Sequence, residues 1–264
     1  EKEHGQRREW VWSKLGRNPL ARALQYLATL ATKSVPIRGA SFDEFVRNYS
    51  SSGCESDTAL LNALTEGKSS QDKTAIHTAL RALYYPWLLD TTENFQKFTV
   101  TTALPTIRQH KDYQVADGIC IIFVDGLRFD LGQRLQALLE ERGLRVSLDH
   151  SWTGVPTVTA SAKPASSPIA SKVGVSLNLP ESFSPFLSGT SQELNTVRFR
   201  KLIEEIGFHI ISEDEAGDPA GKGWTEFGVI DKRGHDLGLD LARQLQEQLE
   251  GIVERVMFLF ESGW

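Results

Sequence analysis

The most constraining feature of this sequence is a continuously apolar run at residues 118–124, which ends directly before Asp125 and Gly126. Its β-branched residues favour a strand, and the lack of polar alternation indicates that both faces of this strand are buried. Strands of this kind occur almost only in parallel sheets that helices cover on both faces. The run therefore predicts an α/β domain built on a parallel sheet.

The residues that follow alternate between helical and extended patterns. Residues 129–141 have the spacing of an amphipathic helix closed by Gly143, and residues 144–148 resemble a second strand, so together they predict a βαβ unit. Five prolines among many serines predict mostly loop, with a short helix or two, over residues 151–196. Beyond this loop we expect a helix at 198–206, short strands at 208–211 and 229–230, a polar, turn-rich segment at 214–224 and a long amphipathic helix at about 237–260.

The first hundred residues predict helices with identifiable starts. Asn18 before Pro19 is a candidate N-cap with proline in the first turn, and Ser41 with Glu44 has the spacing of a capping box. Pro86 should break or kink a long helix because it removes one ladder hydrogen bond. The expected helices cover residues 20–30, 42 onwards, 57–64 and 70–98. We therefore expect two domains, a helical one at 1–112 and an α/β one at 113–264.

Composition limits the compartment and the partners. The 29 basic and 34 acidic residues give a net charge of −5, so a phosphate backbone would have to be bound by a local basic patch. Cys54 and Cys120 lie far apart in the sequence, which excludes a disulfide framework or a thiolate metal cluster and favours a reducing, cytoplasmic location. The longest apolar run is far shorter than the ~20 residues that span a bilayer.

Asp125 is the first candidate for chemistry, because open α/β sheets place their functional residues at the carboxyl ends of strands. A haloacid-dehalogenase-type phosphatase requires a second aspartate two residues later, where this chain has Leu127. A dinucleotide site requires a glycine-rich turn, and only Gly126 and Gly132 are nearby. The remaining functional interpretation is a metal ligand, and the structural alternative is a cap of the following helix.

Asp231 and His235 form a second candidate pair. A carboxylate and an imidazole four residues apart can bind one cation if the backbone between them is helical or turns tightly at Gly234. His235 with Asp236 is also the doublet of HD-type hydrolases, but these enzymes need further histidines, of which His209 is the nearest candidate. The pair alone therefore leaves the kind of site open.

Thr157 and Thr159 stand in a small-residue loop after Pro156. A threonine hydroxyl is a weak nucleophile unless a metal or a neighbouring base activates it. If the loop carries Thr159 to the side of Asp125, a bound metal could supply that activation. The alternative is an ordinary loop.

The order of the three motifs, strand-DGLR, then PTVT, then D-x-x-G-H-x-x-G read from Asp231, resembles the alkaline phosphatase superfamily of two-metal phosphohydrolases. The flanking VDGLRFDLGQRL and the Ser/Pro-rich stretch after PTVT resemble more closely the PglZ-domain branch associated with BREX phage-defence systems. The resemblance covers residues 117–264. It implies an alkaline-phosphatase-like parallel-sheet domain preceded by a helical domain.

The resemblance also implies roles for individual residues. Asp125 matches the carboxylate ligand of the metal that activates the nucleophile, and Thr159 matches the nucleophile and a ligand of that metal, with Thr157 as the second choice. Asp231 and His235 match two ligands of the other metal. The implied cofactors are two divalent ions, Zn or Mn, and the implied reaction is hydrolysis of a phosphate ester.

A complete site of this superfamily also contains an Asp-His pair and one more histidine after a further strand. This chain ends at Trp264, before such a strand, so we expect a fragment with about two protein ligands for each ion and little activity by itself. The expected partners are other defence-system proteins and a phosphate ester or nucleic-acid substrate, without a membrane. The competing hypothesis is a non-catalytic scaffold whose aromatic residues dock partners.

Overall fold

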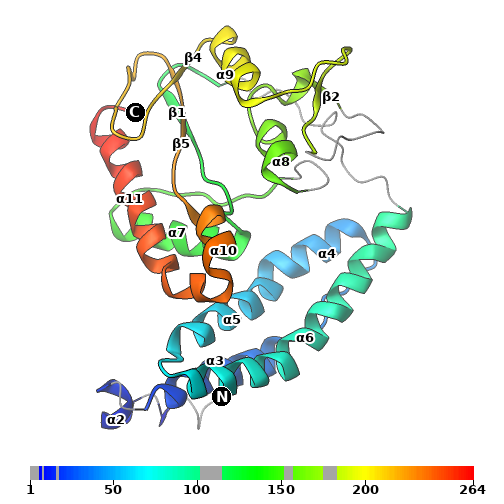
Figure 1. The fold of residues 1–264 in the computed structure, drawn as a ribbon, viewed down its shortest axis with the longest axis vertical. Helices are drawn as coiled ribbons and strands as arrows, with labels where there is room; N and C mark the ends of the chain where they lie inside the picture. The colour runs from blue at the N-terminus through cyan, green and yellow to red at the C-terminus, as the bar shows by residue number, and fades with distance from the viewer. Residues whose placement is uncertain (1–5, 8, 16–17, 102–114, 152–156, 175–182) are drawn as a thin grey trace. The chain divides into compact units, whose positions relative to one another are not determined.

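The computed structural model of this chain describes residues 6–7, 9–15, 18–101, 115–151, 157–174 and 183–264. The protein is mixed α/β (Figure 1), and its internal contacts divide it into two compact units. The helical unit comprises the described residues of Glu1–Ala103, Arg128–Ala137 and Lys232–Glu247. The sheet unit comprises those of Leu104–Leu127, Leu138–Asp231 and Gln248–Trp264. Two segments from the second half of the chain therefore group with the helical residues that precede residue 104.

The helical unit is built from short and long helices joined by brief turns. They are α2 (Val11–Lys14), α3 (Pro19–Lys33), α4 (Phe42–Asn48), the π-helical turn η1 (Tyr49–Gly53), α5 (Cys54–Glu66), α6 (Ser70–Thr101) and the 3₁₀ turn η4 (Gly238–Arg243). Three helices are shared between the two units along the chain: α7 (Phe129–Glu141), α10 (Ile230–Leu237) and α11 (Leu245–Glu261).

Apolar residues at helical spacing form the core of the helical unit. The principal cluster comprises Ala23, Leu30, Ala59, Ala63, Leu64, Ile76, Leu80 and Ala242. A second cluster surrounds Trp87, which is 3% exposed and donates a hydrogen bond from Nε1 to the Val35 carbonyl at 2.9 Å. Trp87 is thus core, whereas its neighbour Tyr85 is 61% exposed.

The helix starts differ in detail from the expectation. The Ser41 hydroxyl accepts from the Glu44 amide at 3.2 Å as a capping box requires, but the Glu44 carboxylate accepts from the Ala40 amide at 2.7 Å rather than from Ser41. The side chain of Asn18 makes no cap hydrogen bond to α3. Pro86 does not break α6, which continues through it from Ser70 to Thr101.

The sheet unit contains a three-stranded parallel sheet in the order β1 (Ile119–Phe123), β5 (Lys222–Glu226), β4 (Phe208–Ile210). Ile119 pairs with Lys222 and Phe123 with Glu226, so β1 and β5 end at the same edge. The remaining elements are α8 (Thr159–Ala165), the 3₁₀ turn η3 (Ala170–Lys172), the short antiparallel pair β2 (Val173–Gly174) and β3 (Phe186–Leu187), and α9 (Thr196–Glu205).

Trp224 stands at the centre of the sheet unit's core. It is 1% exposed, lies 6.1 Å from Phe123 and 5.5 Å from Phe199 between ring centroids, and so joins β1, β5 and α9. The buried residues around it are Ala165, Ile169, Val173, Leu194, Phe199, Ile203 and Phe208. Four of the core residues, Ala165, Ile169, Val173 and Leu194, come from the Ser/Pro-rich stretch, in which the expected short helices are α8 and η3.

Four expectations for the second half were wrong or incomplete. Residues 144–148 form no strand, although the half-buried Leu144 and Val146 alternate with exposed neighbours. Residues 229–230 are not a strand either, because Ile230 begins α10. The central strand β5 occupies part of the segment expected to be polar turns, and the helix expected at about 237–260 is divided into η4 and α11. The strand at 119–123, the helix at 129–141 and the strand at 208–210 are confirmed.

None of the described helices combines the length and the apolar character needed to cross a bilayer.

Candidate active site

The structure brings Asp125 and Thr159 together at the carboxyl end of the parallel sheet. Asp125 lies in the turn that follows β1, and Thr159 is the first residue of α8. The Thr159 hydroxyl donates a hydrogen bond to Asp125 Oδ2 at 2.8 Å, although the two residues are 34 positions apart. Both side chains are half-buried, so this carboxylate and this hydroxyl meet in a partly dehydrated place.

Asp231 is brought to the same turn through its backbone. Gly126 has φ +76°, and a Cβ atom added there would lie 2.9 Å from the Asp231 amide nitrogen. Only glycine allows this conformation and this close approach without strain. The start of α10 therefore packs against the residue next to Asp125, as expected if Asp125 and Asp231 belong to one site.

His235 lies four residues after Asp231 on α10, so the two side chains share one face of that helix. The Asp231 side chain is half-buried and belongs to the sheet unit, whereas His235 is exposed and belongs to the segment that groups with the helical unit. The intervening backbone is helical, which is one of the two conformations that the sequence interpretation required.

The two threonines of the PTVT motif differ clearly in their surroundings. Thr157 is exposed and precedes the helix, whereas Thr159 begins α8 and is hydrogen-bonded to Asp125. Val155 and Pro156 lie outside the described residues. Of the two threonines, Thr159 is therefore the one that contacts Asp125.

Two further charged residues stand at this edge that the sequence interpretation did not identify. Lys163, one helical turn after Thr159 on α8, places Nζ 2.9 Å from Glu226 Oε2. Its ammonium also lies 5.9 Å from the ring centroid of Phe123 and 5.4 Å from that of Phe199. The four-residue spacing from Thr159 was a usable signal for Lys163. Glu226 had no such signal, because it ends β5, the strand that was not predicted.

A cavity of about 350 Å³ lies beside α8. This volume falls within the range of small-molecule pockets. Its lining comes from α8, from the segment before β3 and from the start of α9: Thr159, Ala160, Lys163, Pro164, Ser184, Leu194, Asn195, Thr196 and Phe199. Thr159 thus lines this cavity, whereas Asp125, which accepts its hydrogen bond, does not.

The donor chemistry of the Asp125 and Thr159 pair suits a hard or borderline divalent cation, since a carboxylate and a hydroxyl oxygen lie 2.8 Å apart. Across the described residues, no cluster of three or more His, Cys, Asp or Glu side chains is arranged to hold a metal ion. A metal ion bound at this pair would need further ligands to complete its coordination.

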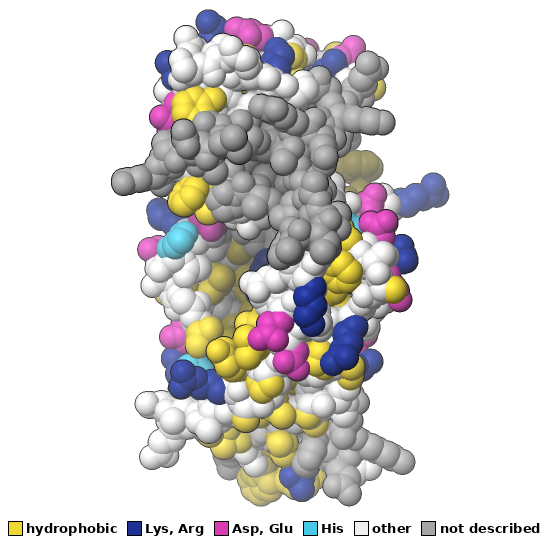
Figure 2. Space-filling view, turned by 90° about the vertical axis from the view of Figure 1, so that its right-hand side faces the viewer, with side chains coloured by type: hydrophobic (Ala, Val, Ile, Leu, Met, Phe, Trp, Pro, Cys, Tyr) yellow, Lys and Arg dark blue, Asp and Glu magenta, His cyan; other side chains and the backbone are white. Residues whose placement is uncertain are grey.

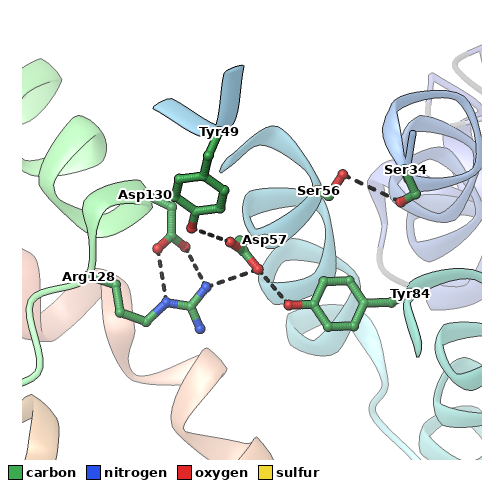
Figure 3. A network of polar contacts seen from close by, with 7 residues as sticks. All are labelled: Ser34, Tyr49, Ser56, Asp57, Tyr84, Arg128 and Asp130. Atoms are coloured by element: carbon green, nitrogen blue, oxygen red, sulfur yellow. Dashed lines mark hydrogen bonds and ion pairs between the residues drawn. The ribbon is translucent and has the colours of Figure 1, made fainter. Parts of the chain in front are cut away.

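The helical unit contains a separate buried polar network (Figure 3). Asp57, which is 5% exposed, accepts hydrogen bonds at 2.6 Å from the hydroxyls of Tyr49 and Tyr84. Arg128 lies 3.3 Å from Asp57 and 3.0 Å from the fully buried Asp130. This network fixes Arg128 of the DGLR motif among α5, α6 and η1.

Burial sets the protonation behaviour of this network. Burial, followed by the charge of Asp57, raises the pKa of Tyr49 and of Tyr84 above their ordinary value. Burial also raises the pKa of Asp130, while its ion pair with Arg128 opposes that shift. The tyrosines therefore act as hydrogen-bond donors to a charged acceptor, a role that keeps them protonated.

Comparisons were made with models of protein families, with curated proteins and with solved structures. No family model, no curated protein and no solved structure matches this chain.

Proposed function

We propose that this chain carries the nucleophile of a metal-dependent phosphohydrolase of the alkaline phosphatase type, similar to PglZ of BREX defence systems. The observation that supports this most is the 2.8 Å hydrogen bond from Thr159 to Asp125, the two residues to which the sequence resemblance gives one metal and one reaction. The approach of Asp231 to Gly126 at the same edge adds to it.

In the proposed reaction, Thr159 Oγ1 attacks the phosphorus atom of a phosphate ester. The threonine proton passes along the existing hydrogen bond to Asp125 Oδ2, an O–P bond forms, and the bond between phosphorus and the leaving oxygen breaks as that oxygen takes a proton from water. Water then hydrolyses the phosphothreonine and releases phosphate. Asp125 returns its proton to Thr159 Oγ1 when the phosphothreonine is cleaved. Lys163, on the same face of α8, stabilises negative charge on the phosphoryl group.

Asp125 and Thr159 would hold one divalent ion, and Asp231 and His235 would contribute to a second. Zn or Mn, when bound, supplies a Lewis acid for the phosphoryl and alkoxide oxygens.

The test is a comparison of two neighbouring threonines in the complete natural protein. With 4-nitrophenyl phosphate or its bis-ester and added Zn or Mn, we expect Thr159→Ala to lower turnover by about three orders of magnitude, because no other group can replace the nucleophile. Thr157→Ala, the matched control, should change turnover by less than about threefold, since Thr157 is exposed. Thr159→Ser, which keeps a hydroxyl, should retain part of the activity. Full activity in Thr159→Ala would refute the assignment.

A second candidate function is a scaffold that docks partners. Trp10 and Trp12 are 51% and 58% exposed at the start of the helical unit, and Tyr85 is exposed on α6. Large exposed aromatic side chains are enriched at protein interfaces. This candidate gains support if Thr159→Ala, Thr157→Ala and Asp125→Ala all leave phosphatase activity unchanged.

A further inference from the structure

A cavity of about 460 Å³ lies wholly within the helical unit, among α3, α5 and the part of α7 that groups with them. This volume falls within the range of small-molecule pockets. None of the residues assigned to the phosphohydrolase reaction lines it. We propose that this cavity binds a free α-amino acid with a neutral polar side chain, whose carboxylate contacts Arg134 and whose ammonium group contacts Glu55.

Polar side chains line this cavity, where the packing of helices against one another would favour apolar ones. Thr58 and Asn62 stand one turn apart on α5, and Gln133 and Arg134 stand on α7. Within the described part of the chain, neither the Thr58 hydroxyl nor the Asn62 side-chain amide makes a hydrogen bond. Both residues are half-buried, so their donors and acceptors are available to a ligand in the cavity.

Arg134 supplies the contact for a carboxylate. Its Nη2 donates to Gln246 Oε1 at 3.0 Å, and no Asp or Glu among the described residues forms an ion pair with it. A guanidinium has five N–H donors in a planar fork, which matches the two oxygens of a carboxylate. Arg134 is half-buried, and a charge-assisted hydrogen bond in such a partly dehydrated place is stronger than one in water.

Glu55 and the buried network of Figure 3 favour an ammonium group in the same cavity. Glu55 Oε2 lies 2.9 Å from Lys33 Nζ, and this leaves Oε1 to accept from a second donor. Asp130 lines the cavity but is fully buried, so it acts on a ligand through its charge rather than by contact. With both carboxylates ionised, Asp57 and Asp130 share the single guanidinium of Arg128, so this network carries one negative charge in excess.

The charges around the cavity therefore select a zwitterion. Three acidic and three basic side chains either line the cavity or pair with its lining, so a ligand without net charge fits them: Asp57, Asp130, Glu55, Arg128, Lys33 and Arg134. An α-amino acid places a carboxylate and an ammonium group a few bonds apart, and it offsets Arg134 without adding a net charge. A nucleic-acid strand is disfavoured as the anion, because basic and acidic side chains are interspersed on the described part of the face in Figure 2 and the net charge is −5.

The test compares three related ligands by calorimetric titration of the 264-residue chain. L-glutamine carries both charged groups and an amide side chain that can pair with the amides of Asn62 and Gln133. L-glutaminamide lacks the carboxylate, and N-acetyl-L-glutamine lacks the ammonium group. We expect each derivative to bind about 10- to 100-fold more weakly than L-glutamine, the value of one charge-assisted hydrogen bond.

Two variants connect each ligand group to its residue. Arg134→Met should weaken binding of L-glutamine about 10- to 100-fold but change that of L-glutaminamide by less than about threefold, because the latter has no carboxylate to lose. Glu55→Gln should show the same contrast between L-glutamine and N-acetyl-L-glutamine. Gln246→Ala removes the hydrogen-bond partner of Arg134 but keeps the guanidinium, so it should bind L-glutamine within a few fold of the unmodified chain. Arg81→Met, at an exposed position of α6 outside the cavity, is the matched control and should leave binding unchanged.

Circular dichroism and thermal melts identify the variants that fold, and the three ligands on the unmodified chain test the site even if a variant does not. Equal affinities for the three ligands would overturn the proposal, as would equal losses for L-glutamine and L-glutaminamide in a folded Arg134→Met. No binding of L-glutamine at about 50 mM, which still detects a Kd above ~1 mM, would also overturn it. L-leucine binding as tightly as L-glutamine would contradict a polar side chain, and a short single-stranded DNA that displaces L-glutamine at a lower concentration than L-asparagine does would give Arg134 to a polyanion instead.

Discussion

Replacement of Gly126 by alanine tests the geometry on which the candidate site depends. Gly126 has φ +76°, and its missing Cβ would lie 2.9 Å from the Asp231 amide nitrogen and 3.2 Å from Asp231 Cα. The substitution therefore imposes two separate costs. One is the strain of an alanine at positive φ, and the other is a clash with backbone at the start of α10.

The two costs can be separated with a second glycine. Gly143 has φ +85°, but a Cβ there would have no atom within 4 Å, so Gly143→Ala carries the strain without the clash. The strain costs about 1–2 kcal/mol, reduced by up to about 1 kcal/mol because alanine restricts the unfolded chain. The clash adds about 1–3 kcal/mol, typical of overpacking against atoms that cannot move freely. We expect the Gly126→Ala protein to be less stable than the Gly143→Ala protein by the cost of the clash, about 1–3 kcal/mol.

The assay is urea unfolding followed by tryptophan fluorescence, with midpoints compared at constant slope. Both glycines belong to the sheet unit, whose core contains Trp224, so the same transition reports on both variants. Equal destabilisation by the two variants would refute the close approach of Asp231 to the turn that bears Asp125. Asp231 would then have no established contact with the turn that bears Asp125.

Two further predictions concern titratable groups. Because the pKa values of Tyr49 and Tyr84 are raised, the folded chain holds these protons more firmly than the unfolded chain, so their contribution to stability is complete below pH ~10 and is lost as the pH rises above it. The free energy of unfolding can be measured by urea denaturation over roughly pH 9–11.5. It should fall less steeply with pH in the Tyr49→Phe/Tyr84→Phe double variant than in the unmodified chain. Equal slopes in the two proteins would contradict the buried network. Burial raises the pKa of the Cys120 thiol to about 11, against a smaller lowering by Arg255, so iodoacetamide at pH ~8 should alkylate Cys120 about two orders of magnitude more slowly than a free thiol. Peptide mass spectrometry measures this rate, and alkylation at the free-thiol rate would show that Cys120 is not buried as described.

Local sequence was sufficient where an element's pattern agrees with its environment. The helix at 129–141 has apolar residues at helical spacing and a glycine after its end, and α7 has those bounds. The apolar run before Asp125 predicts the position of β1 to within two residues, because a short apolar run rich in β-branched residues is typical of a buried strand. The parallel direction of the sheet followed from the same run and is confirmed by its pairing with β5.

Local sequence was insufficient where a strand depends on its neighbours. The segment 144–148 alternates as a strand should, yet it pairs with no other described strand, and alternation cannot supply a partner. Conversely, β5 has the sequence Lys222-Gly223-Trp224-Thr225-Glu226, a composition typical of a turn. A Cβ at Gly223 would lie 2.9 Å from Cys120 Sγ and 2.7 Å from Ile211 Cδ1, so side chains distant in sequence fill the space that this glycine leaves.

The same division holds for the candidate site. The sequence alone determined which residue types follow which elements: a carboxylate after the apolar strand, threonines before a small-residue helix, and a carboxylate and imidazole four residues apart. Only the tertiary structure decided that Thr159 rather than Thr157 reaches Asp125, and that Lys163 and Glu226 stand beside them. The physical reason is that the central strand β5, which the local pattern does not reveal, sets both the edge at which β1 ends and the position of Glu226 opposite Phe123.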